Sequence, residues 1–190
     1  MTQGQKEMPD FRVTRILEKR CTYDKQIATV QQDTANFLTY SSTQLGLTMK
    51  YPHDWIVNEN DILNRYKVIF IPPSRGVYVA VGIMNNITPK VLAQIRASEN
   101  KTPSDIRLLE GDYKHYSLSG YRAVRLVQLQ SYDGPGQPYE VKSVVYGALA
   151  GTNYYTVGYV VTPPEIFPRY LQTAQSMIDS FQILNKQRVQ

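Results

Sequence analysis

The sequence predicts an α/β (α+β) domain built on a mainly antiparallel central sheet that is sandwiched between helices. Apolar side chains recur at every second position in several segments, which is the periodicity of half-buried strands. The last apolar segment has helical spacing instead. Tyrosine is abundant, with 15 residues against 5 Phe and 1 Trp, and it suits strands because its ring packs while its hydroxyl reaches water. The 190 residues are enough for one hydrophobic core.

The first half of the chain contains four segments with strand character. Residues 45–51 alternate apolar and polar side chains and end at Pro52, which cannot donate to a strand ladder. A second strand is expected to start at Trp55, which we expect to be a buried anchor of the core, and a third covers 67–71. The segment 77–84 is apolar at almost every position, which predicts a central strand buried on both faces.

A helix is expected to begin at Thr88 and Pro89. A threonine side chain can cap free backbone N–H groups, and proline is favoured at the first helical position. Pro103 excludes a continuation of the helix beyond about residue 100. The apolar face of this helix consists of Val91, Leu92 and Ile95.

Strand-like segments then follow one another through short turns, which predicts an antiparallel meander. The first is polar, as expected of an edge strand, and the second has an irregular pattern that indicates a β-bulge. Asp133–Gly136 has the composition of a hairpin loop. The four segments are 106–118, 121–131, 139–150 and 154–161.

The final element is an amphipathic helix over residues 169–181, with an apolar stripe that must cover a sheet face. Thr162–Glu165 resembles a capping box, and Pro168 is expected to make the first turn irregular. We expect this helix to lie across one sheet that contains the segments 45–51, 77–84, 121–131, 139–150 and 154–161.

Three regions are expected along the chain. Residues 1–36 are polar and rich in Gln, Lys and Arg, with a weak helical pattern in the second part, and are interpreted as an arm. Residues 37–184 form the domain, and residues 185–190 form a tail. The net charge is +5, but the basic residues are scattered rather than gathered on one face, so no nucleic-acid partner is expected.

The chain has a single cysteine, Cys21, which excludes an internal disulfide and a thiolate metal cluster. No apolar run reaches the ~20 residues of a membrane span, and the first residues lack the apolar core of a signal peptide. From these residues the protein is either intracellular or an exported domain whose signal segment is absent from this chain.

Three motifs resemble the PsbP-like family, which shares its fold with a Ran-binding nuclear import factor. Leu45–Trp55 is similar to the opening strand and Tyr-Pro-x-x-Trp turn of the family. Gly120–Ala123 leads into paired strands that end in Asn153–Tyr159. Met177–Ile183 is similar to the closing helix. The resemblance covers about residues 37–184 and leaves residues 1–36 without a counterpart.

The resemblance implies a sheet sandwiched between helices and a docking, assembly or binding role rather than a shared activity. Nothing in the sequence indicates photosynthesis. The plainer bacterial and archaeal relatives of this type are commonly exported, which implies an extracytoplasmic protein, with a cytoplasmic one as the alternative.

Candidate chemical groups are few. A mixed metal site could use His53, Asp54 and Glu59, or Asp112 and His115, since histidine and carboxylate ligands suit zinc or manganese. The plainer interpretation places His53–Asp54 in a turn and His115 on the solvent face of a strand. Ser117–Gly120 lies near His115 without a nucleophile-elbow motif, and Cys21 lies in the polar arm, so no catalytic, cofactor or metal residue is predicted.

Two glycosylation acceptor patterns, Asn86-Ile87-Thr88 and Asn100-Lys101-Thr102, flank the predicted first helix. Thr88 has the competing role of a helix cap.

The sequence therefore predicts a non-catalytic binding or assembly module that docks onto a larger protein complex or a cell-envelope component. Sheet loops and exposed tyrosines are the expected contacts. The alternatives are a small-ligand or metal-binding protein and, third, an unrecognised hydrolase. We expect no cofactor, no nucleic-acid partner, no membrane span, and a monomer or weak oligomer.

Overall fold

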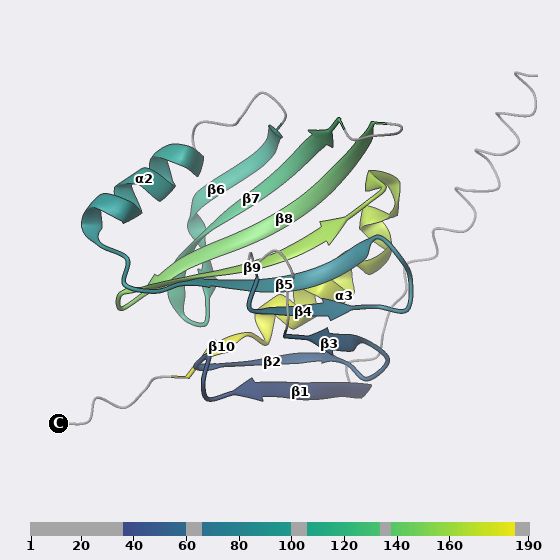
Figure 1. The fold of residues 1–190 in the computed structure, drawn as a ribbon, viewed down its shortest axis with the longest axis horizontal. Coiled ribbons are helices and arrows are strands. Elements are labelled where there is room, and N and C mark those ends of the chain that lie inside the picture. The colour runs from purple at the N-terminus through teal and green to yellow at the C-terminus, as the bar shows by residue number, and fades with distance from the viewer. Residues whose placement is uncertain (1–35, 60–65, 100–105, 134–137, 185–190) are drawn as a thin grey trace, which may run out of the picture.

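Two antiparallel sheets, one of seven strands and one of three, pack around a long helix in the computed structural model (Figure 1). The structure describes residues 36–59, 66–99, 106–133 and 138–184. The arm at 1–35, Cys21 and the tail at 185–190 lie outside the described residues. The elements are β1 (Phe37–Ser42), β2 (Leu47–Pro52), β3 (Ile56–Asn58), β4 (Val68–Ile71), β5 (Val77–Met84), α2 (Pro89–Glu99), β6 (Ile106–Leu118), β7 (Tyr121–Tyr132), β8 (Tyr139–Ala150), β9 (Asn153–Val161), the 3-10 turn η2 (Pro164–Ile166), α3 (Phe167–Asp179) and β10 (Gln182–Ile183).

The seven-stranded sheet has the order β3-β4-β5-β9-β8-β7-β6, and its neighbouring strands are antiparallel throughout. The α+β class, the antiparallel meander and the edge position of β6 are confirmed. The prediction that β5 is an inner strand is also confirmed, because β5 pairs with both β4 and β9.

The expectation that residues 45–51 join this sheet is wrong. β2 belongs to a separate sheet of order β1-β2-β10. Its neighbours are β1, from the same hairpin, and the two-residue strand β10, which follows α3. Alternation showed that 45–51 is a strand but carries no information about which strand it pairs with.

The bulge predicted in 121–131 lies in β6 instead. Pairing between β7 and β8 is unbroken from Ala123 to Tyr132. The register between β6 and β7 shifts at Leu108/Glu110 and at Asp112/Tyr116, and the additional residues are on the β6 side. The irregular apolar pattern of β7 is therefore compatible with regular pairing, because the strand has apolar groups on both faces.

The capping box predicted at Thr162–Glu165 does not form. The 3-10 turn occupies 164–166, and neither it nor α3 has a side-chain cap. Pro168 lies in the first turn of α3, where a missing N–H leaves no helical hydrogen bond unmade. The regular helix consequently starts at Phe167, before the predicted start at residue 169.

One apolar core joins the two sheets and α3. Helix α3 packs against β9 and β2, and Figure 1 shows it ending beside β10. Trp55 is 4% exposed and meets the ring of Tyr170 edge-on at 6.0 Å, which confirms it as a core anchor. The described side chains of α2 are not members of this core. Neither helix in the described ranges is long and apolar enough to cross a membrane.

Candidate functional site

The two faces of the seven-stranded sheet differ in what covers them. Successive strand residues point to opposite faces, and the pairing register assigns one set to the core against α3 and β2. We call this the inner face; Val79, Tyr159, Val144 and Val127 belong to it. The opposite side, which we call the outer face, contributes no residue to the core cluster.

The outer face is nevertheless apolar. Ala80, Val160, Leu126 and Tyr154 of this face are buried. Its margins carry large apolar side chains that are open to solvent. The exposed fractions are 67% for Ile56, 42% for Met84, 36% for Leu108 and 49% for Tyr139.

Small residues keep the centre of this face flat. Ala80 pairs with Gly158, and Gly82 and Gly147 both pair with Thr156. A Cβ added at Gly147 would collide with the hydroxyl and ring of Tyr154, so that ring lies directly on the β8 backbone. A broad and shallow apolar surface results, bordered at one end by the stacked rings of Tyr132 and Tyr139, whose centroids are 5.1 Å apart.

Charge is unevenly divided between the two faces. The carboxylates of the seven strands are Glu110, Asp112 and Glu140, and the register places all of them on the inner side. Arg122 is the single charged strand residue that the register assigns to the outer face, and it is exposed. The outer face is therefore apolar with a positive margin.

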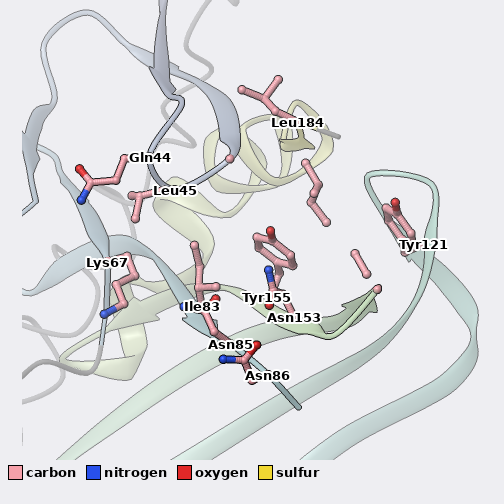
Figure 2. Close-up of a pocket in the computed structure, with 14 residues that line it drawn as sticks. Gln44, Leu45, Lys67, Ile83, Asn85, Asn86, Tyr121, Asn153, Tyr155 and Leu184 are labelled. Atoms are coloured by element: carbon pink, nitrogen blue, oxygen red, sulfur yellow. The ribbon is translucent and has the colours of Figure 1, made fainter. Parts of the chain in front are cut away.

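A pocket of about 600 Å³ lies at one end of the seven-stranded sheet (Figure 2). Here β5 and β8 end, β9 begins, and the β1–β2 turn lies beside them. We call it the end pocket. Apolar groups such as Leu45, Ile83 and Tyr155 line it together with polar side chains. The polar groups are Gln44, Lys67, Asn85, Asn86 and Asn153.

The histidines predicted as candidate ligands lie in different parts of the fold. His53 is exposed in the turn after β2, and its backbone N–H donates to the carbonyl of Asn36 at 3.2 Å. Its predicted companion Glu59 accepts a hydrogen bond from the Tyr40 hydroxyl at 2.7 Å, and Asp54 is exposed in the same turn. The structure brings no third ligand to His53: in the described part of the chain, no three His, Cys, Asp or Glu side chains are grouped as metal ligands.

His115 lies on the edge strand β6, with 79% of its side chain exposed. Its Nδ1 is 2.8 Å from an Asp112 oxygen, so the predicted pairing of these two residues is present. Two hydrogen bonds lower the pKa of Asp112 to about 2. The larger effect comes from the Lys114 backbone N–H and the smaller from the His115 side chain. The pair is a local contact at the surface of an irregular edge strand.

The serines near His115 are not aligned as a nucleophile. Ser117 is exposed on the outer face of β6. Ser119 has a positive φ of 53° and accepts a hydrogen bond from the Ile183 backbone N–H at 2.8 Å, which ties the β6–β7 turn to β10.

Of the two glycosylation patterns, Asn100 lies outside the described residues. Asn86 is exposed, has a positive φ of 58° and lines the end pocket. Thr88 Oγ1 accepts a hydrogen bond from the Val91 backbone N–H at 3.3 Å, which confirms the predicted cap of α2.

Sequence reasoning missed both the outer face and the end pocket. Apolar residues on both sides of 121–131 and 139–150 were a signal that the sheet has two apolar faces, while only one amphipathic helix has a strong stripe. The end pocket had no such signal, because its groups come from turns and strand ends that are distant in the chain.

Comparison with known proteins bears on the fold. No family model matches the sequence, and no curated protein matches it. Among solved structures, the cyanobacterial PsbP of Synechocystis sp. PCC 6803 matches with a TM-score of 0.55 and 14% identity, over 78% of this chain and 93% of that one.

Two further structures are similar. The Ran-binding protein Mog1p of Saccharomyces cerevisiae has a TM-score of 0.54 and 11% identity, over 78% of this chain and 96% of that one. LpqN of Mycobacterium tuberculosis, described as involved in cell envelope biogenesis, has a TM-score of 0.50 and 15% identity, over 78% of this chain and 91% of that one. The chain thus has the PsbP-like fold that the resemblance of its motifs implied.

Proposed function

We propose that this protein is a non-catalytic docking module whose outer sheet face binds a protein partner. The observation that carries the proposal is the register. It places four of the exposed large apolar side chains, Ile56, Met84, Leu108 and Tyr139, on the same face. When large exposed apolar side chains share one face of a soluble protein, that face is a candidate interaction site.

The size of the face suits a specific interface. The five long strands β5 to β9, at ~4.8 Å spacing and ~3.3 Å per residue, span roughly 19 Å by 30 Å, or roughly 600 Å² before side-chain relief. Standard interfaces bury ~800 Å² per partner. The short strands β3 and β4 extend the same face further.

The charge of the face indicates the kind of partner. Carboxylates are absent from the strand residues that the register assigns to it, Arg122 is exposed at its margin, and the whole chain carries a net charge of +5. A partner segment that is apolar at its centre and acidic at its border would complement it. The fold neighbours support a docking role: one is a Ran-binding protein and another is involved in cell envelope biogenesis.

Site-specific photo-cross-linking tests the proposal. A photoreactive amino acid is placed at Ile56 or Leu108 on the outer face, and at Leu38 as the control, since Leu38 is 48% exposed but lies on the other sheet. We expect the outer-face positions to capture one protein that Leu38 does not capture. Binding of that purified protein should weaken at least ~10-fold in Leu108→Asp, by a loss typical of an interface anchor, and remain unchanged in Leu38→Asp.

The proposal predicts an acidic binding segment and therefore a lower affinity at high salt. Equal capture at Leu38 and the outer-face positions would contradict it. Binding of the wild-type protein to anionic phosphatidylglycerol vesicles, lost in Leu108→Asp, would assign the face to a lipid surface instead.

A further inference from the structure

The end pocket combines groups that the outer face lacks. Its floor is apolar, with Ile83 and Tyr155 on the inner side of neighbouring strands, and its rim is polar (Figure 2). It opens beside the three-stranded sheet, so its ligand and the docking partner would occupy different surfaces.

Primary amides dominate the rim. Asn85 directly follows Met84, and Asn153 directly precedes Tyr154, the residue that pairs with Met84. Both asparagines therefore line the pocket at the same end of the sheet. Gln44 and Asn86 add two more amides. Their side chains make no hydrogen bond or ion pair with any other described residue. Each amide can donate and accept at once, which is the capacity needed to bind neighbouring hydroxyl groups.

Backbone hydrogen bonds join the chain segments that carry these amides and leave the amide side chains available. The Ile87 N–H donates to the Thr152 carbonyl at 2.7 Å, which joins the loop after β5 to the β8–β9 turn. The Leu184 N–H donates to the Gly46 carbonyl at 2.8 Å and closes the other wall. A rim fixed by backbone bonds reduces the entropy cost of ordering it around a ligand.

Among the described residues of the lining, Lys67 is the one charged residue and none is a carboxylate. A lysine in a rim of neutral amides favours a ligand with a single negative charge. The half-buried Tyr121 on the far wall and the buried Tyr155 offer ring surface to the C–H groups of such a ligand.

We infer that the end pocket binds a small polyhydroxylated ligand with one carboxylate, the chemistry of a uronic-acid sugar. The amides of Asn85 and Asn153 bind hydroxyl groups, and Lys67 pairs with the carboxylate. Free acidic sugars and the acidic units of a polysaccharide share this chemistry. The inference does not depend on the docking role of the outer face.

Nuclear magnetic resonance titration of the full chain tests the inference, because side-chain amide signals report directly on the rim. The probes are glucuronate, glucose and acetate. We expect saturable shifts of the Asn85 and Asn153 side-chain signals with millimolar glucuronate, weaker ones with glucose, and none with acetate. An oligomer of glucuronate that binds more tightly than the monomer would identify a polysaccharide as the source.

Two substitutions separate the roles of charge and amide. Lys67→Gln should weaken glucuronate about 10-fold, as expected for loss of a charge-assisted bond, and leave glucose unchanged. Asn153→Asp keeps the side-chain shape but places a carboxylate in the rim, so it should abolish glucuronate binding and retain glucose. Lys50→Gln, at an exposed position of β2, is the control.

The inference is overturned if glucuronate produces no saturable shift, or if acetate shifts the same signals with equal affinity, which would show an adventitious anion only. It is also overturned if Lys67→Gln and Lys50→Gln behave alike. A failure of this titration would leave cross-linking at the outer face unaffected, so the two proposals fail separately.

Discussion

The hydroxyl of Tyr159 donates a hydrogen bond to the backbone carbonyl of Phe167 at 2.8 Å, with the Tyr159 side chain fully buried. The bond connects the C-terminal half of β9 to the first turn of α3, and the centroids of the two rings lie 5.1 Å apart. A strand at the middle of the sheet thereby positions the start of the helix that covers it.

Tyr159→Phe should therefore destabilise the protein by about 1 kcal/mol, because it removes a buried hydrogen bond while keeping the ring. Chemical denaturation monitored by circular dichroism measures the change in unfolding free energy. Tyr139→Phe is the matched control, because Tyr139 is 49% exposed. An equal loss in both variants would contradict the role of the buried bond.

Gly76 is expected to be intolerant of a side chain for two separate reasons. Its φ is +77°, and a Cβ there would collide with the Thr162 carbonyl oxygen. Gly120 has a similar φ of +79° but open space around its Cα. Gly120→Ala should cost ~1–2 kcal/mol from backbone strain alone, and Gly76→Ala at least ~2 kcal/mol more, because main chain must move. Thermal unfolding of both variants measures the difference, and equal melting temperatures would show that the Thr162 contact yields easily.

A series of side-chain hydrogen bonds links the inner face of the sheet to the C-terminal part of α3. Arg125 Nε donates to the Tyr146 hydroxyl at 3.2 Å, which donates to Gln175 Oε1 at 3.0 Å, and Gln175 Nε2 donates to Asp179 at 2.8 Å. A double-mutant cycle of Tyr146→Phe and Gln175→Leu should give a coupling energy of ~1 kcal/mol. The same cycle with exposed Gln172→Leu should give none, and coupling in both cycles would indicate a general effect of altering the helix.

The protein should lose stability above about pH 10. Burial and then the hydrogen bond to Glu59 raise the pKa of Tyr40 from 10.0 to about 12, and burial raises the pKa values of Tyr146 and Tyr159. A folded-state pKa above the unfolded value favours the native state fully below the unfolded pKa and progressively less as pH rises through the folded value. This contribution is therefore present at neutral pH and is lost from pH 10 through about 12 for Tyr40.

Tyrosinate absorbance and circular dichroism, recorded together in an alkaline titration, measure this loss. We expect a fraction of the tyrosines to ionise only as the fold is lost, so that both signals change together. Tyr40→Phe should make the decline of stability with pH shallower. Complete tyrosine ionisation while the circular dichroism is still native would contradict the prediction.

Local patterns in the sequence were sufficient for most elements of the fold and for few elements of the site. Alternation in 77–84 and 154–161, and the stripe of α3, each depend on one segment, so they were predicted correctly. The membership of β2 in a second sheet depends on its pairing with β10. The bulges of β6 are register shifts that exist only in its pairing with β7. Neither relationship is encoded in the period of a single segment.

The same reason explains why the binding surfaces were missed. Asn85 and Asn153 are ordinary loop-forming residues until the pairing of Met84 with Tyr154 brings them to the same end of the sheet. Ile56, Leu108 and Tyr139 are three unrelated apolar residues until the strand order places them on one face. The high tyrosine content correctly indicated a large sheet. The distribution of charged residues between its two faces can be assigned only from the complete pairing register.

The three-stranded sheet unites residues from the two ends of the described chain. β2 pairs with β10, and the Lys50 backbone N–H donates to Ser180 Oγ at 2.9 Å across a sequence separation of 130 residues. During synthesis on the ribosome, β2 emerges early and must wait for β10, the last of the described strands, before Leu47 and Thr48 on its open edge are paired. Contacts between such distant segments close slowly. Among the described strands, β1 and β2 are consequently the ones whose pairing is completed last relative to their synthesis, and an open strand edge is a site of wrong pairing during folding.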